Sequence, residues 1–276
     1  MPEFSQIHTA CRDCYFSTTN GKTQVGCELD RIEAYEKAGA DVISAYDDTG
    51  NEFFVINDRI CPYNRTKEWA SEFSKSEVSS IVESQVKIPY QAIIFQRGSV
   101  VTDQSRLVAL NNTIAHLVKQ YNPPSLVSII SNVKEKKLYK ENMALSSILS
   151  CHAKIFDWRV HNMIDNSFSN RSAIDLVIDS TYKENTAYYM VFEAGFKPTN
   201  EMSKEFLDSV YVDGKQPIFC HPIGKTLNGM MANKIIHRKH GGNSFTIHLE
   251  DKVKEFEENA EKHIFNIEDL CPSLKA

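Results

Sequence analysis

The sequence predicts an α/β protein with a mostly parallel sheet and helices on both faces, preceded by a small α+β metal-binding module. Two observations carry this expectation. From about residue 85 onward, apolar runs of strand length alternate with amphipathic segments of helical periodicity, a pattern typical of βαβ units. Four of the seven cysteines fall before residue 62, which sets the beginning of the chain apart from the rest.

A polar, serine-rich segment at 71–84 follows the last of these cysteines, and we place the domain boundary at residue 80. Residues 1–80 then form the cysteine-rich module, and residues 81–276 form the α/β domain. With 42% hydrophobic and 24% charged side chains, the chain has ordinary globular composition, which speaks against extended disorder.

In the first part, residues 28–38 show helical periodicity, and residues 52–56 are a predicted strand after a turn at 47–50. So small a module has little core of its own, and a bound metal would stabilise it.

In the second part, the predicted elements alternate. Strands are expected at 90–95, 126–130, 154–158, 188–192 and 218–220, and helices at 105–121, 141–149, 172–182, 202–210 and 251–263.

Four cysteines are the candidate metal ligands: Cys11, Cys14, Cys27 and Cys61. A CxxC pair presents two thiolates to one metal, and two further cysteines complete a tetrahedral site. Four thiolates leave no open position for a substrate water, so the site is expected to be structural or redox-active. Zinc is the first expectation. An iron–sulfur cluster is the alternative, because Cys61-Pro62 is a pair that often closes cluster motifs.

The net charge of −5 arises in the first 75 residues, which hold 8 basic and 13 acidic side chains. Nucleic-acid binders gather positive charge instead, so we do not expect a nucleic-acid partner. The sequence has no apolar stretch long enough to span a membrane, and its polar N-terminus lacks the apolar centre of a signal peptide. A cytoplasmic location is the expectation, and the cysteine module offers a surface for a protein partner.

Ligands of open parallel sheets bind beyond the carboxyl ends of the strands. The residues that follow predicted strands are therefore candidates for substrate binding. They are Arg97 and Gly98 after the first strand, Asn132 after the second and Glu193 after the fourth. Asp157 is a further candidate because it follows an apolar strand start.

Over residues 85–245, the order of elements and three local segments resemble the nucleotide-sugar glycosyltransferases of the two-lobed, single-sheet (GT-A) type. Residues 170–174 lie where that family opens a helix before its central strand. Residues 188–195 resemble the strand that carries the family's acidic motif. Residues 229–230 and 237–243 resemble its acceptor-side segments.

This resemblance implies a glycosyltransferase A-like fold, a nucleotide-sugar donor and an unknown acceptor. It also implies that Asn170 and Arg171 contact the donor and that Glu193 and His237 take part in catalysis.

One departure from the family weakens a metal-dependent mechanism. The family's acidic motif normally contains two aspartates one residue apart, which hold a divalent cation. Here Glu193 is followed by Ala194-Gly195, so only one carboxylate is present. Three hypotheses stay open: a glycosyltransferase lacking the usual paired aspartates, a non-catalytic protein that uses the metal module for assembly, and an iron–sulfur protein.

Overall fold

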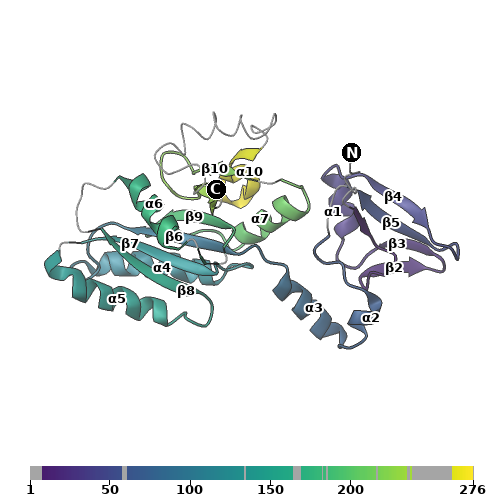
Figure 1. Ribbon diagram of the computed structural model, residues 1–276, viewed down its shortest axis with the longest axis horizontal. Helices are drawn as coiled ribbons and strands as arrows, with labels where there is room; N and C mark the ends of the chain where they lie inside the picture. The colour runs from purple at the N-terminus through teal and green to yellow at the C-terminus, as the bar shows by residue number, and fades with distance from the viewer. Residues whose placement is uncertain are drawn as a thin grey trace. The chain divides into compact units, whose positions relative to one another are not determined.

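The computed structural model describes residues 8–57, 61–133, 135–163, 169–181, 183–184, 186–215, 217–234, 237 and 263–275. The chain divides into two compact units (Figure 1). Unit 1 comprises Met1–Lys87 and Leu207–Lys215, and unit 2 comprises Ile88–Phe206 and Gln216–Ala276.

Unit 1 contains a five-stranded sheet in which β5 pairs with three other strands. Its strands are β1 (His8–Ala10), β2 (Ser17–Asn20), β3 (Thr23–Cys27), β4 (Val42–Tyr46) and β5 (Glu52–Asn57). Its helices are α1 (Arg31–Lys37), α2 (Lys67–Ala70) and α3 (Lys75–Gln85).

The serine-rich segment forms α3, and the predicted boundary at residue 80 falls inside this helix. Ser74 caps it, because its hydroxyl accepts from the Glu77 amide while the Glu77 carboxylate accepts from the Ser74 amide at 2.8 Å. Val78 and Val82 are buried in the core of unit 1. The serine content therefore reflects helix capping and a solvated helix face.

Unit 2 is built on a seven-stranded sheet with the order β12-β10-β11-β9-β6-β7-β8. Four strands are parallel neighbours: β6 (Tyr90–Gln96), β7 (Leu126–Asn132), β8 (Asp157–Met163) and β9 (Tyr188–Glu193). The others are β10 (Phe219–His221), β11 (Met231–Asn233) and β12 (Ile264–Asn266).

The sheet is mixed, which corrects the prediction of a mostly parallel one. β11 runs antiparallel to both of its neighbours, β9 and β10. The chain returns from β10 to β11 through a short loop, whereas a parallel neighbour would need a long crossover.

Helices flank both faces of the parallel strands. Ala173, Ile174 and Val177 of α6 (Asn170–Ser180) share a buried cluster with Phe95 and Ile130 of the sheet. Figure 1 shows α4 (Gln104–Val118) and α5 (Leu138–Ser150) along the opposite face. The remaining helical segments are η1 (Glu135–Lys137), α7 (Met202–Tyr211), α10 (Ile267–Leu270) and η4 (Pro272–Lys275).

The third parallel strand begins at Asp157, three residues later than predicted. Apart from its last residue, the helix predicted at 251–263 lies outside the described residues. Among the helices that are described, none has the length and apolar character needed to cross a membrane.

Candidate functional site

A small pocket lies at the carboxyl ends of β6, β7 and β8. The strand pairing brings these ends level, because Gln96 pairs with Ser131 and Ser131 pairs with Asn162. The pocket has a volume of about 60 Å³ and is lined by Phe95, Gln96, Arg97, Ile130, Asn132, Met163, Ser169, Asn170 and Ala173. Three predicted binding residues, Arg97, Asn132 and Asn170, thus meet in one place from three distant segments.

Helix α6 begins at this pocket. Ser169 caps it, and its hydroxyl accepts from the Ser172 amide at 3.1 Å. The free backbone amides of a first helical turn, together with the helix dipole, favour an anion. Arg171 belongs to the same turn but is not one of the residues that line the pocket. The start of α6 and the guanidinium of Arg97 are the two groups at this pocket that favour an anion.

Arg97 and Glu193 form an ion pair across the strand ends. The Nη2 atom of Arg97 donates to the Glu193 carboxylate at 3.0 Å, with the arginine side chain 60% exposed and the glutamate 31%. Glu193 ends β9, and its backbone amide donates to the Asn228 side chain at 2.7 Å. Exposed pairs of this kind contribute about 0–1 kcal/mol, so either partner can exchange this contact for a ligand.

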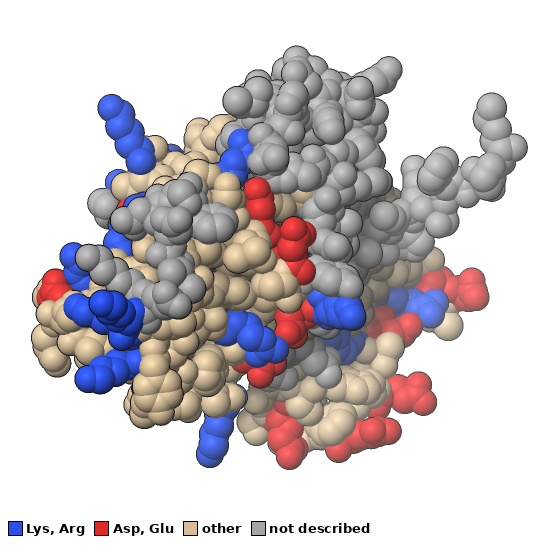
Figure 2. Space-filling view, turned by 60° about the vertical axis from the view of Figure 1, so that its left-hand side comes forward, with Lys and Arg blue, Asp and Glu red and all other residues tan. Residues whose placement is uncertain are grey.

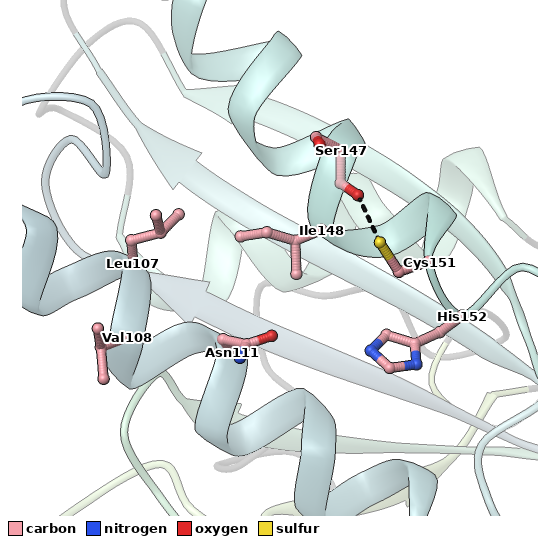
Figure 3. A pocket seen from close by; sticks show the side chains of 7 residues that line it. All are labelled: Leu107, Val108, Asn111, Ser147, Ile148, Cys151 and His152. Atoms are coloured by element: carbon pink, nitrogen blue, oxygen red, sulfur yellow. Dashed lines mark hydrogen bonds between the residues drawn. The ribbon is translucent and has the colours of Figure 1, made fainter.

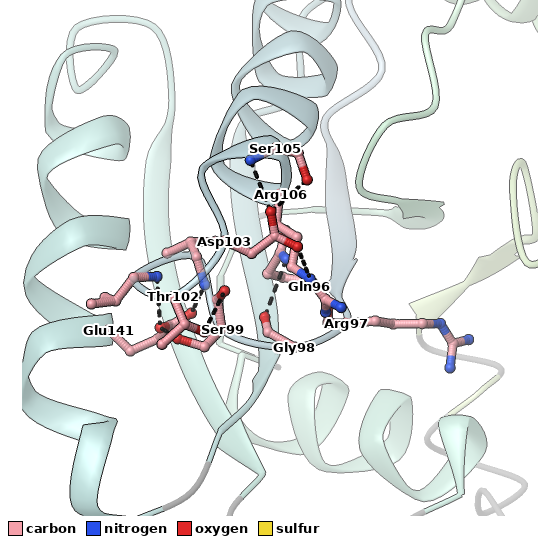
Figure 4. A network of polar contacts seen from close by, with 11 residues as sticks. Gln96, Arg97, Gly98, Ser99, Thr102, Asp103, Ser105, Arg106 and Glu141 are labelled. Atoms are coloured by element: carbon pink, nitrogen blue, oxygen red, sulfur yellow. Dashed lines mark hydrogen bonds and ion pairs between the residues drawn. The ribbon is translucent and has the colours of Figure 1, made fainter.

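The loop that carries Arg97 is tightly organised (Figure 4). The Nε2 atom of Gln96 donates to the Gly98 carbonyl at 3.2 Å. Asp103 caps α4 and accepts from the Arg106 guanidinium at 2.9 Å. Arg106 also donates to the backbone carbonyl of Arg97. Gly98 has a φ of +79°, a conformation that glycine adopts without strain.

Three buried oxygens at this end of the sheet have no hydrogen-bond partner among the described residues. They are Gln96 Oε1, Ser131 Oγ and Asn162 Oδ1, and they belong to one row of paired residues. A buried polar group left unpaired costs about 1–3 kcal/mol. Ser131 and Asn162 do not line the pocket. Side chains alternate along a strand, so those of Ser131 and Asn162 point away from the face that Ile130 and Met163 share with α6, and water is the expected partner.

His237 is not brought to the pocket. Its Nδ1 lies 3.0 Å from the hydroxyl of Tyr189, and its Nε2 lies 2.8 Å from Asp175. Tyr189 pairs with Gln91 near the start of β6, so this cluster belongs to the amino half of the sheet. Burial lowers the pKa of His237, although Asp175 opposes that shift. In this position the histidine links β9 to α6 and lies apart from Arg97 and Glu193.

Asp157 is also away from the pocket. It is the exposed first residue of β8, whereas the pocket is lined by Met163 at the other end of the same strand. Of the acceptor-like segment at 237–243, residues 238–243 lie outside the described part of the chain.

In unit 1 the four predicted ligand cysteines converge on one core. Cys11 and Cys14 are buried in it, and Cys27 and Cys61 pack against it. Burial and the proximity of the other three thiols raise the pKa of Cys11 to about 12. Among the described residues, however, no three His, Cys, Asp or Glu side chains are arranged to hold a metal ion. The structure therefore shows a cluster of thiols and does not show a formed metal site.

A second cavity of unit 2, about 320 Å³ in volume, lies between α4 and α5 (Figure 3). It is lined by Leu107, Val108, Asn111, Ser147, Ile148, Cys151 and His152. Cys151 donates to the Ser147 carbonyl at 3.2 Å. No residue predicted to bind a ligand lies here, and the lining has no acid or permanent cation that would select an anionic ligand.

On the face shown in Figure 2, lysine and arginine side chains are scattered among other residues and form no continuous basic patch. Positive charge on this face is therefore local.

The chain matches no family model and no curated protein sequence. Several solved structures are similar to it, including the following two. The crystal structure of S. aureus TarS 1–349 has 9% sequence identity over 55% of this chain and 49% of that chain, with a TM-score of 0.35. A protein assigned as a nucleotide-diphospho-sugar transferase from Desulfovibrio desulfuricans G20 has 7% identity over 64% and 78%, with a TM-score of 0.37. The chain thus spans about half the length of the TarS structure.

Proposed function

We propose that unit 2 binds a nucleotide-sugar at the carboxyl ends of its parallel strands and transfers the sugar to an acceptor. One observation carries this proposal: the pocket joins Arg97, Asn132 and Asn170 to the first turn of α6. A guanidinium and the start of a helix suit a diphosphate, and neutral amide side chains can bind the sugar or base by hydrogen bonds.

The size of the pocket limits how much of the ligand it holds. Sites that enclose a small molecule usually have volumes of roughly 300 Å³ or more, and this pocket has about 60 Å³. We therefore assign to it one phosphate-sized part of the ligand. The rest would lie along the exposed strand ends, where Arg97 and Glu193 are accessible.

Catalysis is proposed without a paired-carboxylate metal site. Glu193 offers one carboxylate, and Arg97 already neutralises it. In the proposed transfer, an acceptor oxygen bonds to the anomeric carbon while the bond from that carbon to the diphosphate breaks and its electron pair leaves with the diphosphate. Arg97 would turn to the leaving charge and stabilise it. Glu193, released from Arg97, would accept the proton of the acceptor.

A matched pair of arginine variants tests the binding proposal. Arg97 and Arg159 each form an ion pair with one glutamate, at 3.0 Å and 2.8 Å, and both are well exposed. Arg159, however, lies in the amino half of β8. Calorimetric titration with uridine, adenosine and guanosine diphosphate sugars should show binding by the wild type. Arg97→Ala should weaken it at least about tenfold, and Arg159→Ala should leave it unchanged.

Equal affinity of Arg97→Ala and the wild type would remove the basis of the proposal. Release of free nucleoside diphosphate over time would then separate a transferase from the second candidate, a domain that binds the donor without catalysis. The neutralised single carboxylate, Glu193, is the observation that favours this second candidate.

We also propose that the four thiols of unit 1 bind a zinc ion. An iron–sulfur cluster held by the same four cysteines is the alternative. The support is their convergence from separate segments on one core. Burial raises the pKa of the Cys14 and Cys61 thiols. Backbone hydrogen bonds from Arg65, Phe16 and Ser17 to Cys14, and from Tyr63 to Cys61, oppose that rise. Binding would require the sulfurs to move to about 2.3 Å from the ion.

Metal analysis of protein purified without added metal, together with a visible spectrum, tests this second proposal. One zinc per chain without colour supports a structural site, and iron with visible absorption supports a cluster. Cys27→Ser should abolish the metal, whereas Cys220→Ser, a buried cysteine of unit 2, should retain it. Wild-type protein with no metal and four freely titrating thiols would rule the site out.

A further inference from the structure

Glu141 is a fully buried carboxylate that holds the loop between β6 and α4. It lies in the first turn of α5 and has 0% exposure. Its carboxylate accepts from the Ser99 hydroxyl at 2.7 Å, from the Val100 amide at 2.7 Å and from the Val101 amide at 3.4 Å (Figure 4).

The same loop carries Arg97, which is fixed from its other side. The Gln96 side chain and the Arg106 guanidinium both donate to the Arg97 backbone carbonyl. Arg97 thus leaves the end of β6 between two anchors. One anchor is the pair of donors on the Arg97 carbonyl. The other is Glu141, which accepts from the amide of Val100, three residues further along.

Glu141 also connects two walls of the pocket. Helix α5 follows η1, and η1 begins three residues after β7 ends at Asn132. A side chain of α5 that binds the loop after β6 therefore ties this loop to the element that follows Asn132. Both Arg97 and Asn132 line the pocket.

We infer that Glu141 is a positioning residue of the ligand site, which holds the loop so that Arg97 is presented to the anionic ligand. This inference rests on the proposed function of the site. Burial of a carboxylate is costly unless hydrogen bonds compensate it. In the described part of the chain, the compensating donors come from the Arg97 loop. A well-packed apolar residue would stabilise the helix contact at least as well, but it would leave the loop amides unheld.

The test compares Glu141→Gln with Glu205→Gln. Glu205 is a matched control because its carboxylate likewise accepts from a serine hydroxyl, that of Ser273 at 2.8 Å, and from a backbone amide at 3.2 Å. Glu141→Gln should speed hydrogen exchange of the amides at 99–101. It should also weaken binding of uridine, adenosine or guanosine diphosphate about tenfold, because a displaced binding group loses its geometry. Glu205→Gln should change neither.

A double variant distinguishes positioning from general destabilisation. If Glu141 acts through Arg97, Glu141→Gln should weaken binding in the wild type but not further in Arg97→Ala. The same loss in both backgrounds, or unchanged exchange at 99–101, would overturn the inference.

The two proposals fail in distinguishable ways. If the wild type binds none of the three diphosphates, the proposed function is wrong and the positioning role falls with it. If the wild type binds and the Glu141 variants bind equally well, only the positioning role is wrong.

Discussion

The two ends of the unit 2 sheet use buried polar groups in opposite ways. In the amino half, Gln91 donates to the Ser128 hydroxyl at 2.8 Å and accepts from the Thr181 hydroxyl at 3.0 Å. The ammonium group of the buried Lys234 donates to the carbonyl of Thr181 at 3.1 Å. The hydroxyl of Tyr90 is the exception here, because it has no partner among the described residues. This half has the closed networks that stabilise a fold.

At the carboxyl end, Gln96, Ser131 and Asn162 each keep a buried oxygen without a described partner. The side chains of Arg97 and Glu193 form an ion pair at the surface. Unpaired buried groups cost stability unless water binds them. The comparison teaches that one sheet separates an end with closed polar networks from the end that carries the pocket. It predicts that variants of the first end change unfolding and that variants of the second change affinity.

The largest effect is expected in the amino half, for His237→Ala. The substitution removes the hydrogen bonds of His237 with Tyr189 and Asp175, and it leaves the buried hydroxyl of Tyr189 unpaired. We expect a loss of about 2–4 kcal/mol in the free energy of unfolding, measured with urea, and unchanged affinity for diphosphates. The exposed His221 is the control, and His221→Ala should cost little. Equal losses in the two variants would contradict a structural role.

The stability of the same cluster should depend on pH. Burial holds the pKa of His237 below its usual value of 6.5, so the unfolded chain binds the proton more readily than the folded one. The contribution of neutral His237 to the free energy of unfolding is complete above about pH 6.5. It is lost as the pH falls through that value toward the lower pKa of the folded state. Urea unfolding between pH 8 and pH 5 should show this decline, and His237→Ala should make the curve flatter. If the substitution left the pH dependence of the unfolding free energy unchanged, other titrating groups would be its cause.

At the carboxyl end, Gly98→Ala should affect binding more than stability. A Cβ at Gly98 would collide with the guanidinium of Arg106, which holds the Arg97 carbonyl. Gly39 is a matched control, since its φ of +77° is close to the +79° of Gly98 and a Cβ there meets nothing within 4 Å. Both substitutions should cost about 1 kcal/mol through backbone strain. Only Gly98→Ala should weaken diphosphate binding, and equal affinity in the two variants would mean that the loop tolerates displacement.

The sequence predicted that Arg97 and Asn132 follow strands, because each comes directly after an apolar run of strand length. It misplaced the start of β8, because Ile155 and Phe156 continue the apolar run although the strand begins only at Asp157. Periodicity records which residues are apolar but not where pairing starts.

The sequence could not predict contacts between residues that lie far apart along the chain. His237 meets partners 48 and 62 residues away along the chain, and no local pattern distinguishes such a histidine from a catalytic one. Glu141 lies in a predicted helix, where an acidic side chain is usually solvated, so its role depends on a loop that folds back onto it. The spacing of the four cysteines predicted a metal site, and that expectation remains to be tested by the metal analysis.

The smallest effect, and the one that most sharpens the comparison, is expected for Glu193→Gln. The substitution removes the charge that occupies Arg97, and an exposed pair is worth about 0–1 kcal/mol. Diphosphate affinity should therefore rise, by at most about fivefold, while the free energy of unfolding stays the same. Transfer should fall if the carboxylate accepts the acceptor's proton, so affinity and turnover would move in opposite directions. Titration beside an assay for released nucleoside diphosphate measures both, and a drop in affinity would instead show that Glu193 itself binds the ligand.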